Sequence, residues 1–286
     1  MLQTRLWMGA ILIGLAVGVL VVDDWLAPWY PFLLVVVLGL ALAACYEMLV
    51  LLGPARRPSG WLCYAAVAAM VLVNWPAHVA AKTPIAEFID ADAWHWIVGT
   101  FAAAVLVTFL VEIAIFQEPG QSVARIALGT WIVAYLGLLP CFLTQLRWLD
   151  NRGTLALTLA IFVPKCGDSG AYFTGRLLGR HKMAPVLSPK KTWEGAVGHV
   201  VAAVLAAIGI NRLGSLVTIS GGVFAEIGFG ATVGIAGMMG DLAESLIKRD
   251  CQQKDASRIM PGFGGVLDVV DSIIFAAPVA YWWLRI

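Results

Sequence analysis

The sequence predicts an all-α fold, a polytopic integral membrane helical bundle with about nine transmembrane helices. Of the 286 residues, 60% are hydrophobic and only 13% are charged, so a soluble globule could not cover its surface with polar groups. The apolar residues also gather in long runs, and about 20 in a row suffice to cross the hydrocarbon core of a bilayer. Because an open sheet would leave backbone groups unpaired in lipid, we expect every span to be a helix.

Nine segments match this template. They are 6–22, 29–52, 61–75, 94–116, 122–143, 154–172, 195–210, 217–239 and 269–284. The first ends in two aspartates without a cleavage-like site, so we expect an uncleaved span. No intervening loop exceeds about 30 residues, below the usual size of a separate domain. We therefore expect one membrane domain, with N-terminal helices in residues 1–150 and C-terminal helices with the polar loops in residues 151–286.

Basic residues divide unequally between the two sides of the membrane. If the N-terminus is cytoplasmic, 13 of the 19 Lys and Arg residues fall inside and five fall outside, while Lys165 lies within a span. The positive-inside rule favours this orientation. Both strongly polar loops, 176–194 and 240–268, then face the cytoplasm.

The polar stretch after the eighth span has helical periodicity. Its residues Asp241, Glu244, Ser245 and Lys248 recur at intervals of three and four. On a helix continuing from that span they would share one face. Asp268 and Asp271 repeat the spacing where the ninth span begins. The two helix ends can thus aim carboxylates at each other across a turn.

Carboxylates without nearby His or Cys suit hard cations, and Mg²⁺ usually binds one or two carboxylates plus substrate phosphates. A second cation stays open, since paired metals can clamp both oxygens of a displacement at phosphorus. Basic side chains match a polyphosphate, and glycines permit close backbone approach. These residues are Lys248, Arg249, Lys254, Arg258, Gly262, Gly264 and Gly265. We expect a site for a metal-bound nucleotide triphosphate; a solvated cytoplasmic loop is the alternative for Lys254 and Arg258.

A second polar stretch lies between the sixth and seventh spans. Lys165, Asp168 and Tyr172 fall on one helical face, where a Lys/Asp pair can neutralise itself, so a purely structural pair stays open. A short loop before the seventh span offers hydroxyls and two cations to phosphate oxygens. It consists of Ser188, Pro189, Lys190, Lys191 and Thr192. An anchor for anionic lipids is the alternative for this loop.

Other ionisable residues stay outside the predicted site. Glu47 and Glu112 lie within predicted spans and have only apolar neighbours in the sequence, so neither has an identifiable partner. The four histidines show no metal-ligand spacing, and we expect them at interfaces or in loops. They are His78, His95, His181 and His199.

The polar motifs resemble the signature of phosphatidate cytidylyltransferases, also called CDP-diacylglycerol synthases. The chain reads S-x-x-K-R-x4-K-D from Ser245 and P-G-x-G-G-x-x-D-x-x-D-S from Pro261. Upstream, D-S-G-A-Y-x-x-G-R from Asp168 and S-P-K-K-T-W-E-G from Ser188 resemble other marked segments of that family. The resemblance covers most of the C-terminal half. The N-terminal half is similar only in its many spans and in the tripeptide Y-E-M from Tyr46.

The resemblance implies transfer of a cytidylyl group from CTP to phosphatidate, with Mg²⁺, at the cytoplasmic face of a bacterial inner membrane. By motif position, Asp241 and Asp268 would bind the metal, and Asp271, Lys248 and Arg249 would complete the catalytic residues. The implied substrate-binding residues are Asp168, Ser188, Lys190, Lys191, Thr192, Ser245, Lys254, Gly264 and Gly265. The implied partners are CTP, phosphatidate, the lipid bilayer and a second copy in a homodimer, with no nucleic acid.

Two positions depart from the family pattern, and two other functions remain as alternatives. Phe263 stands where the family commonly has His, and Val269 where it commonly has Arg. Any role of that His or Arg is absent here or supplied by another residue.

A polyprenol or dolichol kinase would share the metal and phosphate site but transfer the γ-phosphoryl group. A secondary transporter would instead carry charges near the midplane and two related halves.

Overall fold

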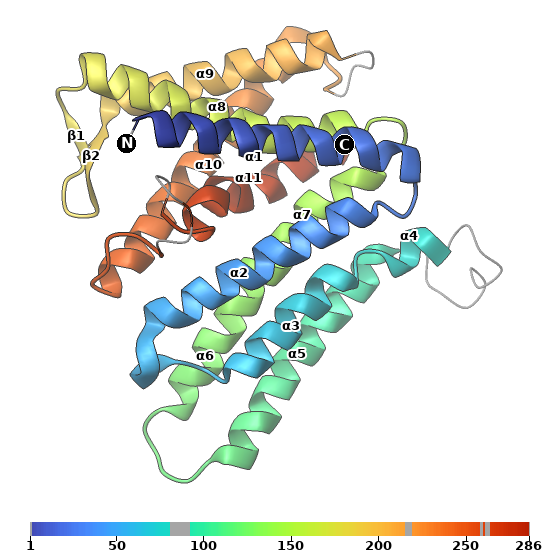
Figure 1. The fold of residues 1–286 in the computed structure, drawn as a ribbon, viewed down its shortest axis with the longest axis vertical. Helices are drawn as coiled ribbons and strands as arrows, with labels where there is room; N and C mark the ends of the chain where they lie inside the picture. Colours follow the sequence, from blue (N-terminus) through green and yellow to red (C-terminus); the bar gives the residue numbers. More distant parts are fainter. Residues whose placement is uncertain (1, 81–91, 215–218, 258–259, 261–263, 286) are drawn as a thin grey trace. The chain divides into compact units, whose positions relative to one another are not determined.

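The computed structural model describes residues 2–80, 92–214, 219–257, 260 and 264–285. Helices make up most of it (Figure 1), which confirms the predicted all-α class. The chain forms two compact units. The first unit comprises Met1–Cys141 and Asp255–Leu267, and the second comprises Phe142–Lys254 and Asp268–Ile286.

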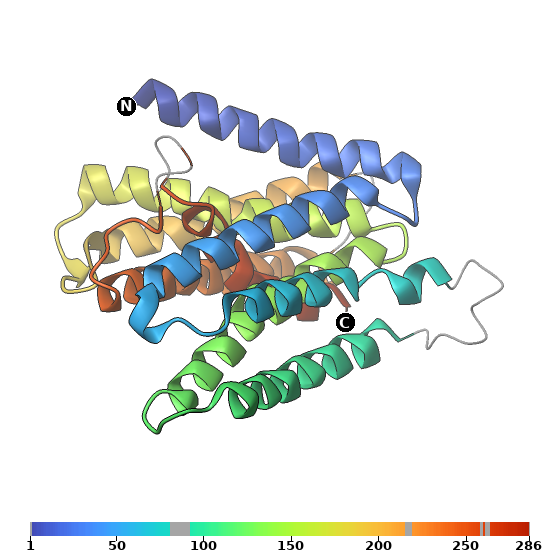
Figure 2. The ribbon, with the colours of Figure 1, turned by 60° about the horizontal axis from the view of Figure 1, so that its bottom comes forward.

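The described residues of the first unit include the α-helices of the N-terminal half. They are α1 (Leu2–Val22), α2 (Pro31–Arg56), α3 (Gly60–Leu72), α4 (Pro76–Ala80), α5 (Ala93–Ile115) and α6 (Ser122–Val133). In Figure 2, α2 and α3 lie side by side, and α3 also packs against α5 and α6. The buried contacts of Met70, Ile97 and Val133 form its core. Gly53 kinks the end of α2, because its φ of 67° is one that glycine adopts without strain.

The second unit contains the C-terminal helices and one hairpin. After α7 (Leu139–Gln145), which links the units, its elements are α8 (Gly153–Leu178), β1 (Lys182–Ala184), β2 (Ser188–Thr192), α9 (Trp193–Leu213), α10 (Gly222–Asp250) and α11 (Leu267–Arg285). Helices α8, α9 and α10 pack against one another. The helix α10 continues 11 residues beyond the predicted end of its span at Met239, as the polar periodicity had indicated.

The prediction of a short loop over 188–192 is wrong. These residues form β2, which pairs antiparallel with β1 so that Ala184 lies opposite Ser188. The hairpin gives hydrogen-bond partners to backbone groups that a loop would leave to water. Thr192 ends the strand and starts α9, because its side-chain oxygen accepts a hydrogen bond from the backbone N–H of Gly195 at 3.1 Å.

The described residues contain eight helical segments long and apolar enough to cross a membrane. Each coincides with one of the nine predicted spans. The remaining predicted span, 154–172, is helical within α8, but Lys165 and Asp168 near its middle lower its hydropathy. Its place across the bilayer stays a prediction.

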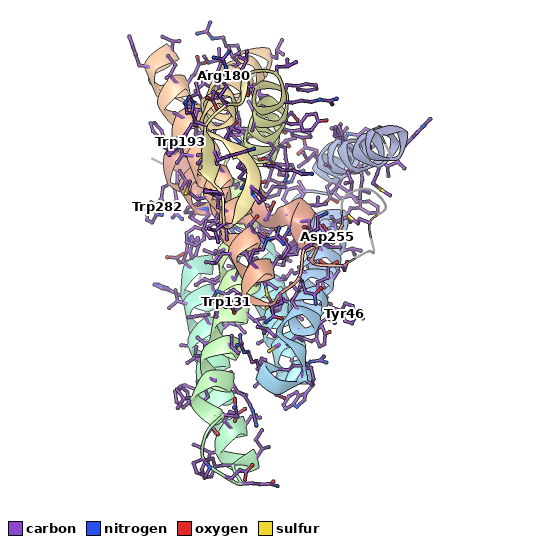
Figure 3. The ribbon with its side chains drawn as sticks, turned by 90° about the vertical axis from the view of Figure 1, so that its left-hand side faces the viewer. Tyr46, Trp131, Arg180, Trp193, Asp255 and Trp282 are labelled. Atoms are coloured by element: carbon purple, nitrogen blue, oxygen red, sulfur yellow. The ribbon has the colours of Figure 1, made fainter. Side chains whose placement is uncertain are left out.

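Large apolar side chains lie on the outside of the helices. On α5, Leu106, Leu110 and Ile113 are all more than 60% exposed, and Trp193 and Trp282 are exposed on α9 and α11 (Figure 3). Exposed apolar surface of this extent is unfavourable in water, at roughly 25 cal/mol for each Å². It is favourable against lipid tails, so the protein is an integral membrane protein.

The close approach of α9 and α10 depends on a glycine. A Cβ atom added at Gly230 would lie 2.6 Å from the Cα of Val204 and 3.0 Å from the carbonyl oxygen of Ala203. Small residues of this kind allow the backbones of membrane helices to touch.

We therefore predict that Gly230→Ala lowers the stability of the protein in detergent by about 1–3 kcal/mol, the usual cost of overpacking. Gly209→Ala on α9 is the matched control, because nothing lies within 4 Å of its added Cβ. Thermal unfolding of both variants checks this. Equal melting temperatures for Gly230→Ala and the unmodified protein would show that the helices do not meet at Gly230.

Candidate active site

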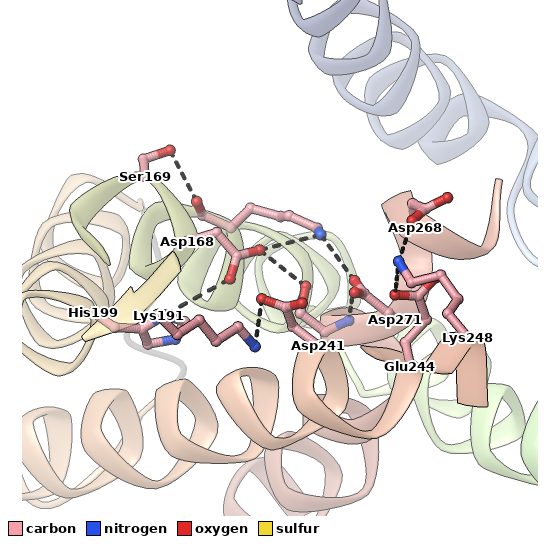
Figure 4. Close-up of polar contacts among 11 residues, drawn as sticks. Asp168, Ser169, Lys191, His199, Asp241, Glu244, Lys248, Asp268 and Asp271 are labelled. Atoms are coloured by element: carbon pink, nitrogen blue, oxygen red, sulfur yellow. Dashed lines mark hydrogen bonds and ion pairs between the residues drawn. The ribbon is translucent and has the colours of Figure 1, made fainter. Parts of the chain in front are cut away.

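The polar ends of α10 and α11 meet in the second unit (Figure 4). Gly240 permits this approach, because an added Cβ would collide with the carbonyl oxygen of Asp271 and lie 3.0 Å from the Cβ of Phe275. Gly237, one turn earlier, faces the carbonyl oxygen of Ser272 and the ring of Pro164. The glycines thus let the carboxylates on α10 come close to those on α11.

Three carboxylates form a compact group at this meeting point. Asp241 and Glu244 on α10 and Asp271 on α11 each offer an oxygen, and these oxygens lie within 4.8 Å of one another. Glu244 is 1% exposed and Asp271 is 4% exposed. The buried Oε1 atom of Glu244 has no hydrogen-bond partner among the described residues. An all-oxygen donor set with one unsatisfied buried oxygen fits a hard divalent cation such as Mg²⁺.

Lysine side chains surround the carboxylate group. The Lys191 Nζ lies 2.8 Å from an oxygen of Asp241, and the Lys165 Nζ lies 3.6 Å from Asp271. Lys248 contacts Glu244 on its own helix and donates to the Asp268 Oδ1 at 2.5 Å. Removing charges from water is costly unless they are paired, so these lysines stabilise the burial of the acidic groups.

The charges in this cluster do not cancel. It contains the carboxylates of Asp168, Asp241, Glu244, Asp268 and Asp271 and the ammonium groups of Lys165, Lys191 and Lys248. With every group ionised, two negative charges remain, which is the charge that one divalent cation balances. A divalent cation is therefore compatible with both the charge of the cluster and its donor atoms.

Asp168 on α8 joins the cluster to two further residues. Its Oδ2 lies 3.3 Å from the Lys165 Nζ and accepts a hydrogen bond from the Ser272 hydroxyl at 3.1 Å. Its Oδ1 lies 3.7 Å from the Nδ1 of His199. The predicted Lys/Asp pair is thus confirmed, and Lys165 also reaches α11, so the pair is part of the cluster.

A cavity of about 210 Å³ opens beside the cluster. It lies between α8, β2, α9 and α10, and its polar lining consists mainly of Asp168, Lys190, Lys191, Thr192, His199 and Asp241. Cationic and hydroxyl groups on one wall and carboxylates on another suit a ligand that carries phosphates and a bound metal ion.

The structure brings most of the predicted α10 and α11 residues together. Asp268, however, was expected to bind the metal with Asp241, and in the structure its partner is Lys248. Asp268 is not a member of the three-carboxylate group. Its assignment as a metal ligand stays a prediction. Ser245, the residue after Glu244 on α10, is also buried.

Several other predicted residues are not members of the carboxylate group. Arg249 donates to the carbonyl oxygens of Leu187 and Gln253, Lys254 is exposed, and Ser188 pairs within the hairpin. Gly264 and Gly265 belong to the first unit. Residues Arg258, Gly262 and Phe263 lie outside the described part of the chain.

Sequence reasoning missed two residues of the site. Glu244 is three positions after Asp241 on the predicted polar face, and that spacing was the available signal for a further ligand. His199 was expected at an interface or in a loop, which is wrong: it is 1% exposed on α9 and lines the cavity. Nothing in its local sequence indicates this, because its neighbours in space, Gly167 and Gly234, belong to other helices.

Comparison with known proteins identifies a family and several relatives. The model of a family described as the cytidylyltransferase family matches residues 3–286. The chain is 40% identical to the phosphatidate cytidylyltransferase of Haemophilus influenzae over 157 residues, 53% of each chain. It is 40% identical to that of Brucella suis over 147 residues, 51% of this chain and 53% of the relative. These matches span about half the length of the two relatives.

A longer match is found in Bacillus subtilis. Its phosphatidate cytidylyltransferase is 32% identical over 213 residues, which cover 70% of this chain and 72% of the relative. Since the family model extends over almost the whole sequence, the match includes the helices that carry the carboxylate cluster. The chain belongs to the cytidylyltransferase family.

Proposed function

We propose that this protein transfers a cytidylyl group from CTP to phosphatidate, giving CDP-diacylglycerol and pyrophosphate. The observation that carries the proposal is the group of Asp241, Glu244 and Asp271 beside a cavity lined by Lys190 and Lys191. Membership of the cytidylyltransferase family and the names of the relatives support the choice of nucleotide and lipid.

Asp241, Glu244 and Asp271 would hold Mg²⁺ in this proposal. The ion supplies positive charge to the phosphate oxygens of the bound nucleotide, which carry increasing negative charge as pyrophosphate leaves. A second cation and direct ligation by Asp268 stay predictions.

The side chains of the protein act by binding and orienting the substrates. The cavity lysines Lys190 and Lys191 and the hydroxyl of Thr192 contact phosphate oxygens and place the α-phosphorus. A phosphate oxygen of phosphatidate forms the new P–O bond, and the bond between the α-phosphorus and the bridging oxygen to the β-phosphorus breaks. The acceptor is already an anion, so no strong general base is required, and positioning and charge stabilisation supply the catalysis.

The distribution of Lys and Arg supports an active site on the cytoplasmic side, and the bacterial relatives support a place in the inner membrane. A homodimer stays a prediction from the family resemblance.

The product of the reaction tests the proposed function directly. Purified protein in mixed micelles with phosphatidate, labelled CTP and Mg²⁺ should form labelled CDP-diacylglycerol and one pyrophosphate for each lipid converted. Chelation of the divalent cation with EDTA should stop turnover, and added Mg²⁺ should restore it. A lipid kinase would instead leave CDP and release no pyrophosphate, and that result would exclude cytidylyl transfer.

Neutral substitutions in the carboxylate group should reduce turnover of the folded protein. We expect Asp241→Asn, Glu244→Gln and Asp271→Asn each to lower kcat/KM by about 100-fold or more, the usual scale for loss of one group that stabilises transition-state charge. Asp250→Asn is the matched control, because Asp250 is an exposed residue at the end of the same helix. Full activity of any of the three variants would remove that residue from the metal site.

A further inference from the structure

Glu47 on α2 is a fully buried carboxylate with partners far along the chain. It is 0% exposed, although the preceding residue, Tyr46, is half exposed on the outside of the helix (Figure 3). Leaving such a charge unpaired among apolar helices would be very costly. The burial of Glu47 therefore requires strong hydrogen bonds.

Three donors from residues 257–267 satisfy this carboxylate. The hydroxyl of Ser257 and the backbone N–H of Val266 donate to Oε1 at 2.6 and 2.9 Å. The backbone N–H of Leu267 donates to Oε2 at 2.8 Å. Hydrogen bonds to a charged acceptor are roughly twice as strong as neutral ones, so Glu47 ties both ends of this segment to α2.

The segment ends where α11 begins. Leu267 is the first residue of α11, and the N–H groups at the start of a helix have no acceptor within the helix. Val266, which precedes it, has no side-chain oxygen to act as a cap. Glu47 supplies the missing acceptor from another helix, and its negative charge also interacts favourably with the helix dipole.

Gly265 gives an independent sign of the same contact. A Cβ atom added at this residue would collide with the Glu47 carboxylate and lie 2.7 Å from its Cδ. Gly265 does not have a positive φ, unlike Gly264 with its φ of 106°. The contact with Glu47, and not the backbone conformation, is therefore what requires glycine at position 265.

We propose that Glu47 is a positioning residue for the metal site, because it fixes the start of the helix that carries Asp268 and Asp271. Asp268 follows directly after Leu267 in the chain, and Asp271 lies one turn later. This inference rests on the proposed function for its relation to catalysis. Its effect on metal binding can be measured without either substrate.

The test measures Mn²⁺ binding to the purified full-length protein by electron paramagnetic resonance, together with thermal unfolding. Glu47→Ala should weaken Mn²⁺ binding by about 10- to 100-fold, the usual effect of losing a group that orients a ligand. Glu47→Gln keeps one acceptor oxygen and should fall between Glu47→Ala and the unmodified protein. Hydrogen exchange at the Val266 and Leu267 amides should be faster in Glu47→Gln than in the unmodified protein, and faster still in Glu47→Ala.

Two further variants separate positioning from a general loss of stability. Glu112→Ala removes another buried carboxylate, on α5, and should leave Mn²⁺ affinity unchanged even if the melting temperature falls. Gly265→Ala should weaken Mn²⁺ binding in the unmodified protein but have no further effect when combined with Glu47→Ala, because the colliding carboxylate is then gone.

Unchanged Mn²⁺ affinity in folded Glu47→Ala or Glu47→Gln protein would overturn the proposal, as would an equal loss in Glu112→Ala. If Glu47→Ala does not fold, Glu47→Gln and the single variant Gly265→Ala decide the question. If the unmodified protein binds Mn²⁺ with the expected dependence on Glu47 but forms no CDP-diacylglycerol, the proposed function fails and the positioning role stands.

Discussion

The close approach of α10 and α11 is the constraint on which the candidate site depends. Glycines at 237 and 240 let the backbone of α11 lie against α10, and Glu244 and Asp271 are then buried near each other. Like charges repel more strongly in the interior of a membrane protein than in water, because the effective dielectric constant is lower. Cations that lie among the carboxylates offset this repulsion.

Three lysines from different elements provide part of this compensation. Lys165 comes from α8, Lys191 from β2 and Lys248 from α10. Since each contacts a carboxylate that is already in place, the group is held in position before any ligand binds. A site organised in this way requires little rearrangement when charge develops on a phosphoryl group. With every group ionised, two negative charges remain on the carboxylates, and a bound divalent cation would balance them.

Residue spacing predicted the helices and their polar faces, but not the contacts between distant segments. The apolar runs indicated the spans, and the i, i+3 and i, i+4 spacings placed Asp241 and Lys248 on one face of an extended α10. Local patterns could not indicate that Asp268 would pair with Lys248, because two carboxylates on one helix end compete for the same cations and only packing decides between them. For the same reason Glu47 had no visible partner, since its donors are 210 to 220 residues away.

The central claim is that Asp241, Glu244 and Asp271 hold the divalent cation used with the nucleotide. Anomalous diffraction from crystals of the protein grown with Mn²⁺ tests it most directly, because the signal locates the ion without assumptions about its ligands. We predict one strong peak within coordination distance of these three carboxylates. A peak bound elsewhere, with Glu244 and Asp271 contacted only by lysines, would contradict it.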